Sequence, residues 1–413
     1  MSILKKSCAA VAGLLLLSTA HAATIDLTGL GFVTYGDGQS YSLPIANYQY
    51  GFSTNNGPYA IPSTPGQIQD LVVLNTGSEG QQVTTNFAGM DDAYSTPTGS
   101  TGGETFFYSS TTTDRGFSAP EPTGNLDTTW DTSLSALQTF TAGEELVFFF
   151  NNNQTNSGTA ADQTLAAWAR LWITAADGTT VVAGSTFEFT NDDSPYAIVT
   201  EGGGGTFFGD PTLYTATGSG AGDPTNDFPL SGDTDWVVSG GQLCVASNGS
   251  NPIPIPVSCG ISQGDLSLLG DGTLLLADVS AAINHNLGAD HVAYAVIFPE
   301  LNALLTSLYG SIADLSDYTL HVDVRYGCEG DAGGGWMDCL DTSVAQWGNG
   351  LNNGYEQLFI GTAITGVCPP DDTLCNPTVP EPATLALMGL GLAGIGIGYR
   401  RRRVKAEPEN KIE

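Results

Sequence analysis

The sequence has 413 residues, and its 43 acidic residues against 11 basic ones give a formal net charge of −32 at pH 7. Only Arg115, Arg170 and Arg325 supply positive charge between Thr24 and Pro380, where the chain has 39 acids. Such a surface repels phosphate backbones and anionic lipids, which excludes nucleic-acid binding. Divalent cations, basic partners and neutral sugars are the candidate ligands, although the acidity can also serve solubility alone.

The chain begins with a pattern typical of a secretory signal peptide over residues 1–22. Lys5 and Lys6 precede an apolar core at residues 9–17, and residues 20–22 (AHA) form a small-x-small cleavage site. The apolar run is short for a bilayer span. We therefore expect cleavage after residue 22 and export of the rest across the inner membrane of a bacterium.

Residues 23–367 form the predicted exported domain, and their sequence pattern is typical of a mainly β fold. Short runs rich in aromatic and β-branched residues alternate with Gly, Asn, Asp, Ser and Pro, which favours a β-sandwich of jelly-roll type with few short helices. A Gly-rich, Asp-Pro-containing stretch leaves a division into two β domains near 200–235 as an alternative, and residues 95–124 also resemble a loop. The predicted strands are residues 145–150, 165–174, 186–190, 236–238, 291–298, 318–326 and 355–360.

Two local signals add a turn and a helix. Asp177-Gly178 predicts a two-residue hairpin turn, because both positions of that turn need positive φ. A helix is expected to start at Pro299 and to end near Gly310. Its apolar stripe is Leu301, Leu304, Leu305 and Leu308.

The predicted strand at residues 165–174 carries a candidate carbohydrate site. Period-two alternation places Trp168, Arg170 and Trp172 on the face opposite the aliphatic residues. Two indoles beside a guanidinium can stack a sugar ring and donate to its hydroxyls. The alternative is that this face packs under a loop or a second sheet, with the arginine stem covering apolar surface.

The histidines give only weak indications of catalysis. His321, Asp323 and Arg325 alternate along one predicted strand and share its polar face, with an Asp–Arg pair on it. His285 and His291 are interpreted as solvated residues flanking a turn. The sequence contains no GxSxG elbow, Walker A loop or HExxH motif, so no catalytic residue is predicted, although a carboxylate pair for glycoside hydrolysis remains an alternative.

Calcium is the candidate metal, because carboxylates in Gly-rich loops are the oxygen ligands that it prefers. None of the acidic clusters fits the EF-hand loop or the GGxGxD repeat, so no cofactor is assigned and the metal stays unknown. The clusters are residues 191–193, 223–227, 233, 235 and 371–372.

Six cysteines remain after removal of the leader, and an even number in an exported chain favours disulfides. The cysteines form three neighbouring pairs, and the spacing does not fit a structural zinc site. The predicted disulfides are Cys244–Cys259, Cys328–Cys339 and Cys368–Cys375.

The C-terminal stretch VPEPATLALMGLGLAGIGIGYRRRR ends the chain in an ordered series of parts. Residues 368–379 form a Cys/Pro linker, residues 383–399 an uncharged helix of about 25 Å, and residues 404–413 a cytoplasmic tail. Arg400, Arg401, Arg402 and Arg403 would stop transfer and stay cytoplasmic. The GxGxxG match inside the uncharged run lacks the strand and the βαβ unit of a dinucleotide site.

Pro380, Glu381 and Pro382, the helix and the arginines together resemble a PEP-CTERM sorting domain over residues 380–403. The resemblance implies an exported precursor held transiently in the inner membrane by a short transmembrane helix. It also implies recognition at Pro-Glu-Pro by an exosortase, a membrane protease, which removes the tail. The family occurs in bacteria that make exopolysaccharide, and its members are thought to reach the cell envelope or the biofilm matrix.

These observations predict a non-catalytic cell-surface or extracellular-matrix protein that associates with exopolysaccharide. The alternatives are a secreted hydrolase acting on that polysaccharide and a single-span membrane protein that keeps its tail.

Overall fold

In the computed structural model the chain divides into two units, Met1–Thr365 and Gly366–Glu413. The first unit includes residues on both sides of 200–235. The predicted signal peptide, linker, sorting signal and tail lie outside the described residues. These are 24–30, 32–53, 55–68, 71–77, 86–97, 106–112, 122–153, 165–190, 198–201, 205–208, 237–239, 242–250, 255–257, 263–267, 272–285, 287–288, 290–327, 351 and 356–365.

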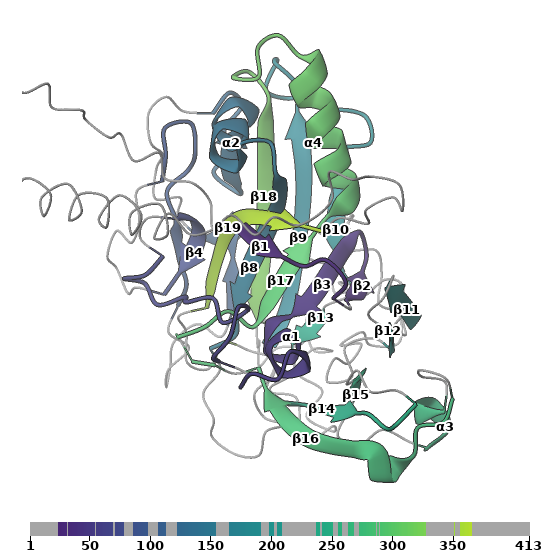
Figure 1. Ribbon diagram of the computed structural model, residues 1–413. Coiled ribbons are helices and arrows are strands. Elements are labelled where there is room, and N and C mark those ends of the chain that lie inside the picture. Colours follow the sequence, from purple (N-terminus) through teal and green to yellow (C-terminus); the bar gives the residue numbers. More distant parts are fainter. Residues whose placement is uncertain are drawn as a thin grey trace, which may run out of the picture. The chain divides into compact units, whose positions relative to one another are not determined.

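An eight-stranded sheet forms the first layer of the fold (Figure 1). Its strands are ordered β2-β3-β17-β8-β19-β4-β5, and β1 pairs in parallel with β19. The bounds are β1 (Thr24–Asp26), β2 (Val33–Tyr35), β3 (Gly38–Ser42), β4 (Val72–Thr76), β5 (Tyr94–Ser95), β8 (Glu145–Asn151), β17 (Tyr294–Ile297) and β19 (Gln357–Ile364).

A six-stranded sheet forms the second layer, in the order β10-β9-β18-β6. Two further strands lie off this path: β13 pairs with β9, and β7 pairs with β18. The bounds are β6 (Phe106–Tyr108), β7 (Trp130–Ser133), β9 (Leu165–Thr174), β10 (Phe187–Phe189), β13 (Val237–Ser239) and β18 (Thr319–Gly327).

The main core lies between these two sheets. Phe148 and Phe150 of β8 belong to the same buried cluster as Leu171 of β9 and Val322 of β18. The Phe150 ring lies 5.1 Å from the ring of Tyr326 on β18, which joins the layers directly. The prediction of a mainly β, sandwich-like fold with few helices is therefore confirmed.

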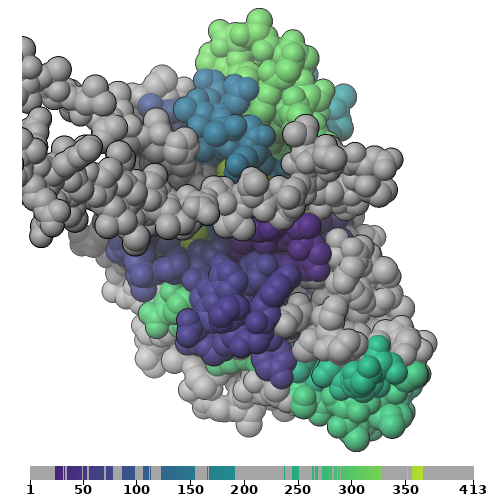
Figure 2. Space-filling model, viewed as in Figure 1, coloured from purple at the N-terminus to yellow at the C-terminus, as the bar shows by residue number. Residues whose placement is uncertain are grey.

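The first sheet is buried on its other face as well. Val147 and Phe149 alternate with the core residues of β8 and pack in a second cluster with Leu27 and Leu43 of the N-terminal segment. Both faces of β8 are thus covered, which explains why ELVFFFN reads as a continuous apolar run rather than an alternating one. Part of the N-terminal segment, coloured purple to blue, lies on the front face in Figure 2.

Short helices join the strands. The predicted helix is confirmed as α4, in which Leu301 and Leu305 are buried. Helices α1 and α2 were not predicted, and their N-terminal amides are capped by Ser42 and Ser133. No helix in the described part of the chain is long and apolar enough to cross a membrane. The bounds are α1 (Leu43–Gln49), α2 (Leu134–Thr141), α3 (Gln263–Leu266) and α4 (Pro299–Ser311), with 3-10 turns η1 (Ser109–Thr111) and η4 (Leu276–Asp278).

Two smaller β elements complete the described fold. A three-stranded sheet has the order β15-β14-β16, and Val245 and Ile283 from it pack against Ile45 of α1. A separate hairpin joins β11 and β12. The bounds are β11 (Ile198–Glu201), β12 (Gly205–Phe208), β14 (Gln242–Ala246), β15 (Ile255–Val257) and β16 (Val279–Asn284).

The turn after β9 differs from the prediction. Gly178 has a φ of 70°, but Asp177 is not among the residues with positive φ. The Asp177 carboxylate instead accepts the backbone N–H groups of Thr179 and Thr180 at 3.0 and 2.7 Å. The side chain of Asp177 therefore holds a longer turn, where the sequence pattern indicated a two-residue one.

Candidate functional site

The outer face of the second sheet collects most of the side chains that the sequence singled out. The paired strands place Trp168 opposite Arg325, Arg170 opposite Asp323 and Trp172 opposite His321. The alternate residues of β9 and β18 enter the core instead. The six side chains form one polar–aromatic face, made of Trp168, Arg170, Trp172, His321, Asp323 and Arg325.

Trp168 makes cation–π contacts with both arginines of this face. The guanidinium carbon of Arg325 is 4.2 Å from the centre of the Trp168 ring, and that of Arg170 is 5.4 Å away. Trp168 is only 1% exposed. Cation–π contacts within the protein thus occupy an indole that the carbohydrate hypothesis needed open to a ligand.

Both arginines are held by carboxylates. Arg170 Nε donates to Glu188 Oε1 of β10 at 2.7 Å, and Arg325 Nη2 donates to Asp323 Oδ2 at 2.7 Å. The second pair is buried, and Asp323 also accepts the Ser109 hydroxyl at 2.8 Å. The Asp–Arg pair expected on this strand is therefore present, but within the fold and not on its surface.

Trp172 is partly buried, and its ring stacks on the imidazole of His321. The two centroids lie 5.2 Å apart with an interplanar angle of 22°. One face of Trp172 is therefore occupied by the protein. The predicted residues do share one face, yet they do not form an open platform with two free indoles.

His321 takes part in a hydroxyl–imidazole–carboxylate chain that the sequence did not predict. Its Nε2 lies 2.8 Å from Thr174 Oγ1, and its Nδ1 lies 2.8 Å from Asp131 Oδ1. This order of groups resembles that of a nucleophilic triad. However, His321 and Asp131 are 0% exposed and Thr174 is 3% exposed, so all three side chains are buried.

Asp131 makes the hydrogen bonds that hold the Thr174–His321–Asp131 group in place. Its carboxylate accepts the Thr129 hydroxyl and the Leu126 N–H, each at 2.6 Å, and its own N–H donates to Asp91 Oδ2 at 2.7 Å. Each of these bonds satisfies a buried polar group. These hydrogen bonds fix the position of the His321 ring within the fold.

Metal binding depends on the grouping of His, Cys, Asp and Glu side chains. Among the described residues, no group of three or more His, Cys, Asp or Glu side chains could hold a metal ion. The acidic clusters at 191–193, 223–227, 233, 235 and 371–372 lie outside that part of the chain. Calcium binding there stays a prediction.

His285 corrects the interpretation that both neighbouring histidines are solvated. It is 0% exposed, its Nε2 lies 2.5 Å from Ser42 Oγ, and its ring stacks on Tyr294 at 5.0 Å. Burial lowers the pKa of His285 from 6.5 to about 3, so the imidazole is neutral. His291 forms an isolated bridge with Pro62, and Asp290 is exposed.

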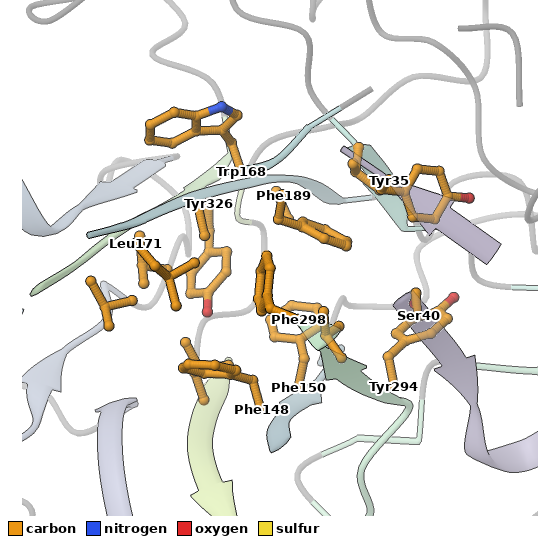
Figure 3. Close-up of a pocket in the computed structure, with 17 residues that line it drawn as sticks. Tyr35, Ser40, Phe148, Phe150, Trp168, Leu171, Phe189, Tyr294, Phe298 and Tyr326 are labelled. Carbon is orange, nitrogen blue, oxygen red and sulfur yellow. The ribbon is translucent and has the colours of Figure 1, made fainter. Parts of the chain in front are cut away.

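A cavity of about 70 Å³ lies between the two sheets (Figure 3). Aromatic side chains surround it, including Phe148, Phe150, Phe189, Phe298 and Tyr326. An apolar space of this kind stays dry, and it offers few partners for the hydroxyls of a sugar. The cavity is therefore not a saccharide site.

Among the predicted disulfide residues, only Cys244 is described. It lies on β14 opposite Val257 of β15, two residues before Cys259. Cys259 lies outside the described residues, and the three pairings stay predictions. The sorting residues Pro380, Glu381, Pro382 and Arg400–Arg403 lie outside the described residues, as do Cys328, Cys339, Cys368 and Cys375.

The two packed sheets define a mainly β domain. Residues 378–403 match the PEP-CTERM protein-sorting motif. Residues 24–325 match the family described as Domain of unknown function (DUF8239), and the chain belongs to this family. No curated protein and no solved structure matches the chain. The motif confirms the predicted resemblance and implies export, a membrane-held precursor and exosortase processing.

Proposed function

We propose that this chain is a non-catalytic protein of the cell surface or extracellular matrix that associates with exopolysaccharide after exosortase processing. The observation that carries the proposal is the PEP-CTERM motif at residues 378–403, which follows the domain at 24–325. The motif indicates the localisation of the protein. The role after arrival is inferred from the domain itself.

Burial of the His321 chain supports a non-catalytic role. Catalysis by Thr174 would need a substrate carbonyl or glycosidic carbon within contact distance of its hydroxyl. The hydroxyl is covered, and its partners His321 and Asp131 are fully covered. Thr174, His321 and Asp131 therefore contribute to the stability of the second sheet.

The charge of the domain supports a neutral polysaccharide as partner. Between Thr24 and Pro380 there is no lysine, and of the three arginines Arg170 and Arg325 are both paired with carboxylates. Few cations are thus left to bind a polyanion, and the acidic surface would repel one. A chain of neutral sugars meets no such repulsion.

Co-sedimentation with purified matrix polysaccharide tests this function. We expect the mature protein to be retained by the polysaccharide, with no shortening of the polymer and no release of reducing ends. Reducing ends that disappear when one specific carboxylate pair is replaced would establish the alternative, a secreted hydrolase. Failure of the matrix polysaccharide to retain the protein would reject the association.

A further inference from the structure

The loop that follows α1 exposes two aromatic side chains. Tyr50 is 56% exposed and Phe52 is 46% exposed, the largest exposed fractions among the described aromatic residues. Residues near position 50, coloured purple-blue, lie on the front face of the molecule in Figure 2. Single exposed apolar residues are common on protein surfaces, so the surroundings of the pair decide its meaning.

The backbone of this loop is fixed to α1. The Tyr50 N–H donates to Ala46 O at 3.2 Å, and the Phe52 N–H donates to Asn47 O at 2.9 Å. Asn47 is 0% exposed, and its side-chain oxygen accepts the Tyr59 N–H at 3.0 Å. Asn47 thus connects both ends of the loop to the helix, one end through its backbone carbonyl and the other through its side-chain oxygen.

Tyr50 and Phe52 also pack against neighbouring residues of the same segment. The rings of Tyr50 and the buried Tyr59 lie 5.6 Å apart. Gly57 packs so closely that a Cβ atom there would lie 2.9 Å from Phe52 Cβ and 2.4 Å from the Asn47 side-chain oxygen. These contacts restrain the backbone at both exposed aromatic residues, which lowers the entropy lost on binding.

The charge pattern around the pair differs from that of the rest of the chain. No charged residue occurs between Asp37 and Asp70, in a chain with a net charge of −32. Ser53, Asn55 and Asn56 are exposed and supply neutral hydrogen-bonding groups.

We propose that Tyr50 and Phe52 form a stacking surface for a neutral polysaccharide, with Asn55 and Asn56 bonding to sugar hydroxyls. Sugar rings present apolar C–H faces that pack on aromatic rings, while amide groups both donate to and accept from hydroxyls. This site rests on the proposed association with exopolysaccharide and gives it a location. It replaces the platform on β9, where Trp168 is covered.

Affinity electrophoresis of the mature protein tests the site. The gels contain the exopolysaccharide extracted from the producing cells, neutral hydroxyethylcellulose, or anionic alginate. The variants are Tyr50→Ala, Phe52→Ala and the double variant, and the matched control is Leu275→Ala, because Leu275 is also 56% exposed. Thermal unfolding checks that each variant stays folded.

We expect the exopolysaccharide to retard the wild type and the control equally. Each single variant should bind about tenfold more weakly, and the double variant should migrate as in an empty gel. Retardation of the folded double variant equal to that of the wild type would overturn the site but leave the proposed function standing. Stronger retardation of the wild type by alginate than by hydroxyethylcellulose would overturn the neutral class of ligand. A wild type that its own exopolysaccharide does not retard would overturn the proposed function together with the site.

Discussion

The guanidinium of Arg325 on β18 lies over the indole of Trp168 on β9, with 4.2 Å between its central carbon and the ring centre. Both side chains are 1% exposed, and Asp323 pairs with the arginine at 2.7 Å. The contact joins the two longest strands of the second sheet on the face opposite the core. It stabilises the sheet by a cation–π contact and an ion pair together.

Replacing Arg325 by Leu should therefore destabilise the protein. The Asp323 carboxylate would stay buried without its cation, which costs about 3–5 kcal/mol of unfolding free energy. Urea denaturation followed by circular dichroism measures the loss. The double variant Asp323→Asn, Arg325→Leu is the control and should recover part of the stability; a loss below about 1 kcal/mol in the single variant would contradict the role given to this pair.

His285 should make stability fall in acid. Its folded pKa of about 3 lies below the ordinary value of 6.5, so between these pH values the unfolded chain binds a proton that the folded protein does not. The stabilisation is complete above pH 6.5 and is lost by about 1.4 kcal/mol per pH unit as the pH falls toward 3.

Chemical denaturation of the wild type and His285→Gln at several pH values between 7.5 and 4 measures this effect. The glutamine keeps a polar partner for Ser42 but does not titrate, so its profile should be flatter over this interval. Parallel profiles for the two proteins would show that His285 is not buried in its neutral form.

Glu356 should make the stability of the protein fall as the pH rises, which is the opposite of the effect of His285. Burial raises its pKa from 4.5 to about 8, so the folded protein keeps a proton that the unfolded chain releases. The contribution of Glu356 to stability is complete below pH 4.5 and falls by about 1.4 kcal/mol per pH unit up to about pH 8. The variant Glu356→Gln, which is neutral at every pH, should gain on the wild type as the pH rises. A constant difference between the two from pH 5 to 8 would refute this assignment.

A disulfide between Cys244 and Cys259 should appear as one linked peptide species in a digest of the protein. Val257 lies opposite Cys244 in the β14–β15 hairpin, so a disulfide to the residue two positions later would close a short loop. Peptide mapping without reduction should recover Cys244 and Cys259 in one linked species. A peptide linking Cys244 to any other cysteine would contradict the proposed connectivity.

The sequence predicted the long strands well because their patterns are strong. The predicted strand at 165–174 matches β9 residue for residue, and its alternation correctly separated Leu171 from Trp172. Helix α4 was visible from its leucine stripe and its N-terminal Pro299. The helices α1 and α2 were missed, because each has only about two turns and depends on packing against a sheet.

The candidate sites were harder to predict because they depend on distant residues. Thr174 and Asp131 meet His321 only through the register of β18 with β9 and β7, which no local pattern contains. Burial of Trp168 likewise depends on Arg325, far along the chain. The loop with Tyr50 and Phe52 had a usable signal, namely an uncharged stretch rich in Tyr, Asn and Gln within an acidic chain.

The intact mass of the mature protein from the native cell tests most directly whether the chain is exported and processed at its sorting motif. The mass should correspond to a chain that starts after residue 22 and has lost the segment containing Arg400–Arg403. A mature species that still contains Arg400–Arg403 would contradict the claim and establish an unprocessed single-span membrane protein.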